Sequence, residues 1–248
     1  MNLFKLLLPA LLSIFFSAHI FAVETKITLR AKSVDAKFIG TSVGGLRAIV
    51  TDAETGEILD SGWIRGDTGS TDTLIVNPIA RGQQITDDKT ASFVAHVDIS
   101  SPRLLKFTVI GPYAHRQSLQ EASVTSWIIP GKHIMGDGII LDIPGFIVDT
   151  WASVMEGGIV DIFVEAAMLC GCKISPNTEW KPKNFEAKAI IMLDGEKITE
   201  VNLDFTGPVA IFSGKTTLDQ SGHYKVIAYL FDEKTGNVGV ARTIFEIN

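Results

Sequence analysis

Apolar and polar residues alternate with a period of two along most of this chain. Ile27 and Leu29 are separated by polar residues, and the apolar residues between Leu46 and Val50 follow the same pattern. Successive side chains of a β-strand point to opposite faces, so this period is typical of strands with one buried face. Amphipathic helical periodicity is nearly absent. The pattern therefore predicts an all-β protein.

Many short apolar runs follow one another, with turn signals between them. This arrangement is typical of sandwiches or barrels rather than of βαβ units. One weak helix candidate covers residues 118–123. Strands are expected at residues 27–29, 34–38, 46–50, 58–64, 73–76, 91–99, 104–110, 122–129, 139–143, 159–169, 185–193, 197–204, 210–218, 224–231 and 238–247.

The first 22 residues have the composition of a secretory signal peptide. A single positive charge, Lys5, precedes an apolar run that ends at Ala22, a small residue suited to cleavage. The expected product is a periplasmic or secreted protein, with an uncleaved N-terminal anchor as the alternative. No later apolar run is long enough to span a bilayer, so no membrane span is expected after cleavage.

The charge balance narrows the classes of partner. The chain has 22 Lys and Arg against 28 Asp and Glu, a formal net charge of −6, and the two signs are interspersed. Nucleic acids and anionic membrane surfaces call for clustered basic residues. We therefore expect no nucleic-acid partner and predict another exported or envelope protein as the partner.

The turn dipeptide Pro144-Gly145 interrupts an apolar run near the middle of the chain. It divides the chain after the leader into residues 23–144 and 145–248, each the size of one antiparallel β-sandwich domain. Alternatively, residues 146–151 form a strand exchanged between the two domains. The polar segment 66–89 is the longest expected surface loop.

The C-terminal half resembles immunoglobulin-like β-sandwich modules of exported bacterial proteins. The residues that carry the resemblance are Asp219, Gly222 and Tyr224, followed by an alternating strand and a hairpin loop at 232–237. In that family the tyrosine hydroxyl bonds to backbone a few residues upstream and pins a corner between the sheets. The usual inter-sheet cysteine two residues after Tyr224 is missing. The hairpin at residues 47–61 is similar to prealbumin-like or carboxypeptidase-regulatory-like modules.

The two cysteines of the chain lie one residue apart, as Cys170-Gly171-Cys172. If residues 159–172 form a strand, Met168, Cys170 and Cys172 share its apolar face. In an oxidising compartment the two thiols are expected to pair, and Gly171 can bend the backbone to bring them together.

The same cysteines allow two other interpretations. Three soft sulfur ligands on one face, Met168, Cys170 and Cys172, are what a Cu(I) site uses. A pair that closes so small a loop adds little stability, which keeps a thiol–disulfide exchange role open. The segment 173–183 is a candidate lid, with Trp180 over the sulfurs.

The rest of the chain has no catalytic signature. There is no Gly-x-Ser-x-Gly motif and no glycine-rich phosphate loop, and His96, His115, His133 and His223 are scattered singly. The sequence therefore predicts an exported, non-enzymatic β-sandwich protein that acts as a binding, accessory or scaffold module. Periplasmic copper binding and a thiol–disulfide partner role are the alternatives.

Overall fold

The computed structural model describes residues 21–207 and 210–248, and the expected signal peptide lies almost entirely outside them. Within these residues the fold is all-β, as predicted, with fifteen strands in four sheets and no closed barrel. The strands are β1 (Val23–Ser33), β2 (Leu46–Asp52), β3 (Ile58–Ile64), β4 (Phe93–Ile99), β5 (Arg103–Gly111), β6 (Gln120–Ile128), β7 (Ile134–Ile143), β8 (Phe146–Val154), β9 (Ile159–Met168), β10 (Glu186–Leu193), β11 (Glu196–Asn202), β12 (Asp204–Phe205), β13 (Ile211–Thr217), β14 (Gly222–Phe231) and β15 (Val238–Ile247).

The first seven strands form two sheets, which we call the first group. Their strand orders are β4-β1-β7 and β3-β2-β5-β6. All pairs are antiparallel except β1 with β7, which run parallel. Strand β2 shows why this sequence forms strands, because Leu46, Ala48 and Val50 are fully buried while the residues between them are half-buried.

The other eight strands form two further sheets, the second group, with orders β11-β10-β14-β15 and β12-β13-β9-β8. All their pairs are antiparallel. In β14 the residues Tyr224, Val226 and Ala228 are buried in alternation. In β9 the even-numbered residues from Val160 to Met168 are buried, so the predicted apolar face of this strand is confirmed.

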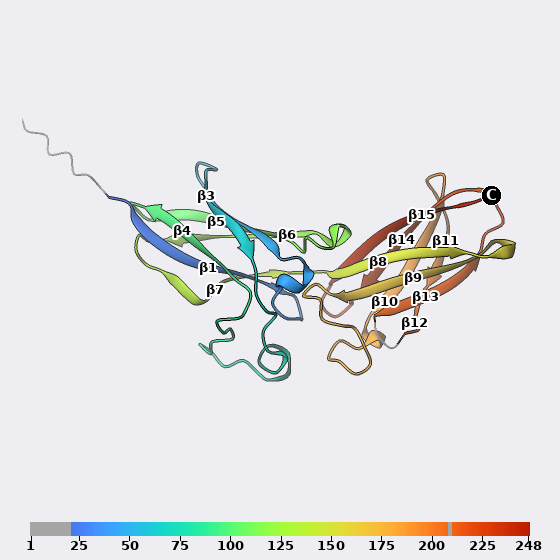
Figure 1. Cartoon of the computed structure of the whole chain (residues 1–248), viewed down its shortest axis with the longest axis horizontal. Coiled ribbons are helices and arrows are strands. Elements are labelled where there is room, and N and C mark those ends of the chain that lie inside the picture. Colours follow the sequence, from blue (N-terminus) through green and yellow to red (C-terminus); the bar gives the residue numbers. More distant parts are fainter. Residues whose placement is uncertain (1–20, 208–209) are drawn as a thin grey trace, which may run out of the picture.

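Figure 1 shows an elongated molecule, with the first group at one end and the second group at the other. The chain passes from β7 to β8 through Pro144 and Gly145 alone. Residues 146–151 pair with β9 of the second group, so they are not a strand exchanged into the first group. Strand β8 also packs against β15 of the facing sheet.

Hydrogen bonds join the two groups directly. Asn237, which is fully buried, accepts from the Gly145 backbone N–H and donates to the Val34 carbonyl, both at 3.0 Å. The Ser118 hydroxyl accepts from the backbone N–H of Val148 at 3.0 Å. These bonds, at several separate points, fix how one group sits on the other.

Three local predictions were wrong. Residues 73–76 belong to a short π-helix, η2 (Asp72–Val76), rather than to a strand. Residues 34–36 form a tight turn in which the Ser33 N–H donates to the Lys37 carbonyl. The weak helix candidate at 118–123 is a 3₁₀ turn, η3 (Arg116–Ser118), followed by strand β6. In the described part of the chain, the helices are all too short to cross a bilayer.

Candidate functional site

The cysteine pair sits in a tight turn at the end of β9. The strand ends at Met168, one residue before the expected end at Leu169, and the supposed continuation to Cys172 does not form because the chain reverses there. The Gly171 N–H donates to the Met168 carbonyl at 2.7 Å, and the Met168 N–H donates to the Cys172 carbonyl at 3.0 Å. Gly171 has φ +79°, a value that glycine adopts without a side-chain penalty.

The turn brings the two sulfur atoms to disulfide distance, with the Cα atoms of Cys170 and Cys172 5.5 Å apart. An extended strand would separate these Cα atoms by about 6.6 Å. The expectation that all three sulfur residues share one strand face is therefore wrong for Cys172, because the chain has already turned. Met168 and Cys170 lie in the core, whereas Cys172 is only partly buried.

Both cysteines line a pocket of about 570 Å³, the junction pocket, formed where the two groups of sheets meet. One wall comes from the turn at 170–173 and the loop that follows it. The opposite wall comes from the first group, including the short 3₁₀ helix η1 (Thr41–Val43). The lining residues are Lys37, Thr41, Ser42, Gly66, Asp67, Thr68, Cys170, Gly171, Cys172, Lys173, Thr178 and Trp180.

Gly171 fits directly against the first group. A Cβ atom built on Gly171 would lie 2.8 Å from Cγ1 of Val43, closer than side chains normally pack. The turn therefore packs against the first group as a wedge. Only glycine fits at position 171, because a side chain would come too close to Val43 and because φ is positive there.

The candidate lid, residues 173–183, is a loop tied by hydrogen bonds over residues 173–180, and it ends in the 3₁₀ turn η5 (Pro182–Asn184). The Thr178 hydroxyl donates to the Lys173 carbonyl at 3.0 Å, and the Ser175 N–H donates to the Trp180 carbonyl at 3.1 Å. Trp180 is buried, and its indole N–H donates to the Asp35 carbonyl at 2.8 Å. Trp180 thus lines the same pocket as the sulfurs and ties the loop to the first group.

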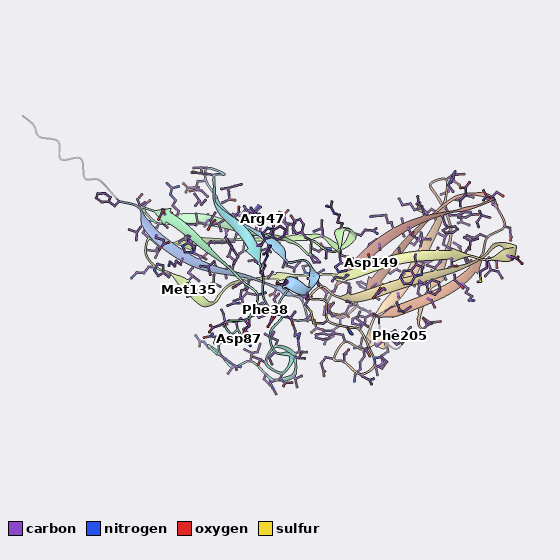
Figure 2. All side chains as sticks on the ribbon, viewed as in Figure 1. Phe38, Arg47, Asp87, Met135, Asp149 and Phe205 are labelled. Atoms are coloured by element: carbon purple, nitrogen blue, oxygen red, sulfur yellow. A yellow bond between two sulfur atoms is a disulfide. The ribbon has the colours of Figure 1, made fainter. Side chains whose placement is uncertain are left out.

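A smaller pocket of about 300 Å³ borders the same turn. It contains His115 from the first group, with Asp149 and Glu165 from neighbouring strands of the second group. His115 Nδ1 is 3.4 Å from Asp149 Oδ2, and Figure 2 labels Asp149 near the middle of the molecule. His133 lies elsewhere, where its Nδ1 accepts from the Lys26 backbone N–H.

Tyr224, named by the immunoglobulin-like resemblance, makes a hydrogen bond to upstream backbone. Its hydroxyl donates to the Gln220 carbonyl at 2.8 Å, and its ring stacks on Phe245 with centroids 5.2 Å apart. Gly222 has φ +150°, and a Cβ there would approach Leu193 to 2.7 Å. Asp219 is exposed. These residues hold the start of β14 and lie apart from the junction pocket.

The copper interpretation depends on the oxidation state of the cysteines. Copper(I) is bound by thiolate and thioether sulfur, and two sulfurs joined to each other offer no thiolate. The set Met168, Cys170 and Cys172 therefore applies only to the reduced chain. Among residues 21–207 and 210–248, no three His, Cys, Asp or Glu side chains are grouped so as to hold a metal ion.

Sequence reasoning missed the half of the junction pocket that comes from residues 37–68. These residues are polar or small and have no motif, and they lie more than one hundred positions before the cysteines. A sequence signal that points toward this wall is Trp180. It is a large aromatic residue in a polar loop, and its indole N–H needs a hydrogen-bond partner. No protein-family model matches this chain, and no curated protein matches it significantly.

Proposed function

We propose that this chain is an exported, non-enzymatic scaffold or binding protein of the periplasm or cell exterior. In this proposal, residues 23–144 and 145–248 are two β-sandwich domains, the second of them immunoglobulin-like. Residues 1–22 direct export and are removed. The partner is another exported or envelope protein, in keeping with the net charge of −6.

The observation that carries this proposal is the fixed junction. Asn237, Trp180 and Ser118 each make a hydrogen bond between the two groups of sheets. Domains that touch through small polar interfaces move relative to one another by default, and these bonds, of which the Ser118–Val148 bond is buried, oppose that motion. A stiff, elongated molecule can hold two binding faces at a constant separation, as a scaffold requires.

Strand β6 supplies the best candidate contact face. It is an edge strand of its sheet, and Trp127 is 62% exposed on it. Val124 and Ile129 are also exposed nearby. Exposed aromatic residues are enriched at protein–protein interfaces, and an edge strand can add a strand from a partner.

A photo-crosslinking amino acid tests this face in the cells of origin. Placed at Thr125, an exposed residue of β6, it should give one discrete adduct with an envelope protein, and Trp127→Ser should abolish that adduct. The matched control is Thr217, an exposed residue of β13 in the second group. Equal adducts at both positions, or none at Thr125, would refute the proposed face.

Export is tested separately. Mass spectrometry of protein released by osmotic shock should give a chain that begins at Val23. Recovery of the full-length chain from the cytoplasm alone would contradict the proposal.

A further inference from the structure

The two sulfurs of the cysteine pair differ in how they meet solvent. Cys170 is 1% exposed and belongs to the core, whereas Cys172 is partly exposed and borders the junction pocket. A reagent that enters the pocket therefore reaches Cys172 first. Thiol–disulfide exchange depends on which sulfur is accessible to the attacking thiolate.

The pocket is also more positive than the molecule as a whole. Its lining contains two ammonium groups, Lys37 and Lys173, and one carboxylate, Asp67, whereas the chain carries a net charge of −6. Lys37 Nζ donates to the Gly69 carbonyl at 3.3 Å, and within residues 21–207 and 210–248 Lys173 makes no ion pair. Lys37 is therefore available to an anion in the pocket, whereas Lys173 borders both this pocket and the smaller one that contains Asp149 and Glu165.

Positive charge has two effects on exchange chemistry. It stabilises the thiolate form of a cysteine over the thiol, which offsets part of the cost of releasing the buried Cys170 as an anion. It also attracts anionic reagents and repels cationic ones. The hydroxyls of Thr41, Ser42 and Thr68 on the same lining can hydrogen-bond to a carboxylate or peptide group.

We infer that the junction pocket is a thiol–disulfide exchange site that takes thiol-bearing acidic peptides and is attacked at Cys172. A peptide thiolate forms a bond to Cys172 Sγ, the Cys170–Cys172 bond breaks, and Cys170 leaves as a thiolate that then takes a proton. A second thiol of the peptide, as thiolate, displaces Cys172 in turn. The peptide loses two electrons and two protons and becomes a disulfide, and this chain gains both as two thiols.

This site does not depend on the scaffold proposal, because it requires only the purified folded chain. It does connect to the junction, since the turn that carries the cysteines is the wedge against Val43. Exchange at Cys172 therefore takes place at the point where the two groups of sheets meet.

The first experiment maps the attack. Oxidised protein is mixed with reduced glutathione, which is anionic, or with cysteamine, which is cationic, and is quenched with acid for peptide mapping. The mixed disulfide should form on Cys172 in at least about tenfold excess over Cys170, following its exposure. A synthetic peptide of residues 165–176, which has the pair but no pocket, serves as the reference. The glutathione-to-cysteamine rate ratio should be higher in the protein than in this peptide.

Two sets of variants make the test decisive. Lys37→Gln should lower the glutathione rate about threefold, the factor for one unit charge near 7 Å in water, and Lys215→Gln on the outer face of β13 should not. Cys170→Ser protein should form a mixed disulfide with oxidised glutathione at least about ten times faster than Cys172→Ser protein. Attack mainly on Cys170, or rates and charge preference equal to those of the peptide, would overturn the inference.

Discussion

Asn237 offers the sharpest test of how the two groups of sheets are joined. We predict that Asn237→Ala lowers the free energy of unfolding by about 1.5–4 kcal/mol. The side chain is fully buried and bonds at once to Gly145 and Val34. Removing it leaves the buried Gly145 N–H without a partner, which costs about 1–3 kcal/mol. Val34 is only half-buried, so losing the hydrogen bond to its carbonyl adds about 0.5–1 kcal/mol.

The measurement is urea unfolding followed by far-ultraviolet circular dichroism. Asn237→Asp should cost at least as much at pH 7, because it keeps an acceptor for Gly145 but places a buried carboxylate oxygen against the Val34 carbonyl. The matched control is Asn202→Ala at the exposed end of β11, where the side chain makes no hydrogen bond with the residues described. The reasoning is refuted if Asn237→Ala costs less than about 0.5 kcal/mol, or no more than the control.

Three further substitutions test other features. Tyr224→Phe removes the bond to the Gln220 carbonyl and should cost about 1 kcal/mol in urea unfolding; no loss would contradict the corner's role. Gly171→Ala should lower the melting temperature more than Gly236→Ala, since both have positive φ but only Gly171 meets a neighbouring side chain; equal shifts would exclude the wedge. Asp52 accepts hydrogen bonds from two backbone N–H groups of the following turn and from a guanidinium, which lower its pKa. Because the folded pKa is depressed, the contribution of Asp52 is fully present above the unfolded value of about 3.9 and is lost as pH falls from there through the lower folded pKa. Unfolding of Asp52→Asn measured from pH 6 to pH 2.5 should therefore depend less on pH than that of the original chain, and identical profiles would refute this.

Most strands could be predicted from the sequence because alternation is a direct consequence of a half-buried strand. The runs at 46–50 and 224–231 obey it closely, and both are strands. The run at 73–76 has too few residues to distinguish the strand period of two from a helical period, and it forms a single π-helical turn. The strand expected at 159–169 is nearly correct, but its supposed continuation to residue 172 is a turn, because alternation cannot show where glycine takes a positive φ.

The candidate site was predicted only in part, for a different reason. The cysteines could be found because they are the two thiols of an otherwise thiol-free chain. Their unequal burial follows from the reversal at Met168, which depends on local hydrogen bonds. Lys37 and Thr68 reach the same pocket only through the tertiary arrangement of the first group. Polar loop residues have no periodic pattern from which their neighbours in space could be predicted.

The directions of β1 and β15 determine how the molecule would respond to tension along its length. In Figure 1, β1 begins at the outer end of the first group and runs inward, whereas β15 runs outward to the C-terminus, marked C at the outer end of the second group, and both lie along the long axis. A pull on these two outer ends therefore acts parallel to the strands. The ladder between β14 and β15 would be loaded in shear, with its ten register pairs bearing force together rather than opening one after another. Strand β1 is held on both sides, by β4 and by β7, whereas β15 is held in its sheet on one side. The first strand to be drawn out should therefore be β15, and the first group should outlast the second under load.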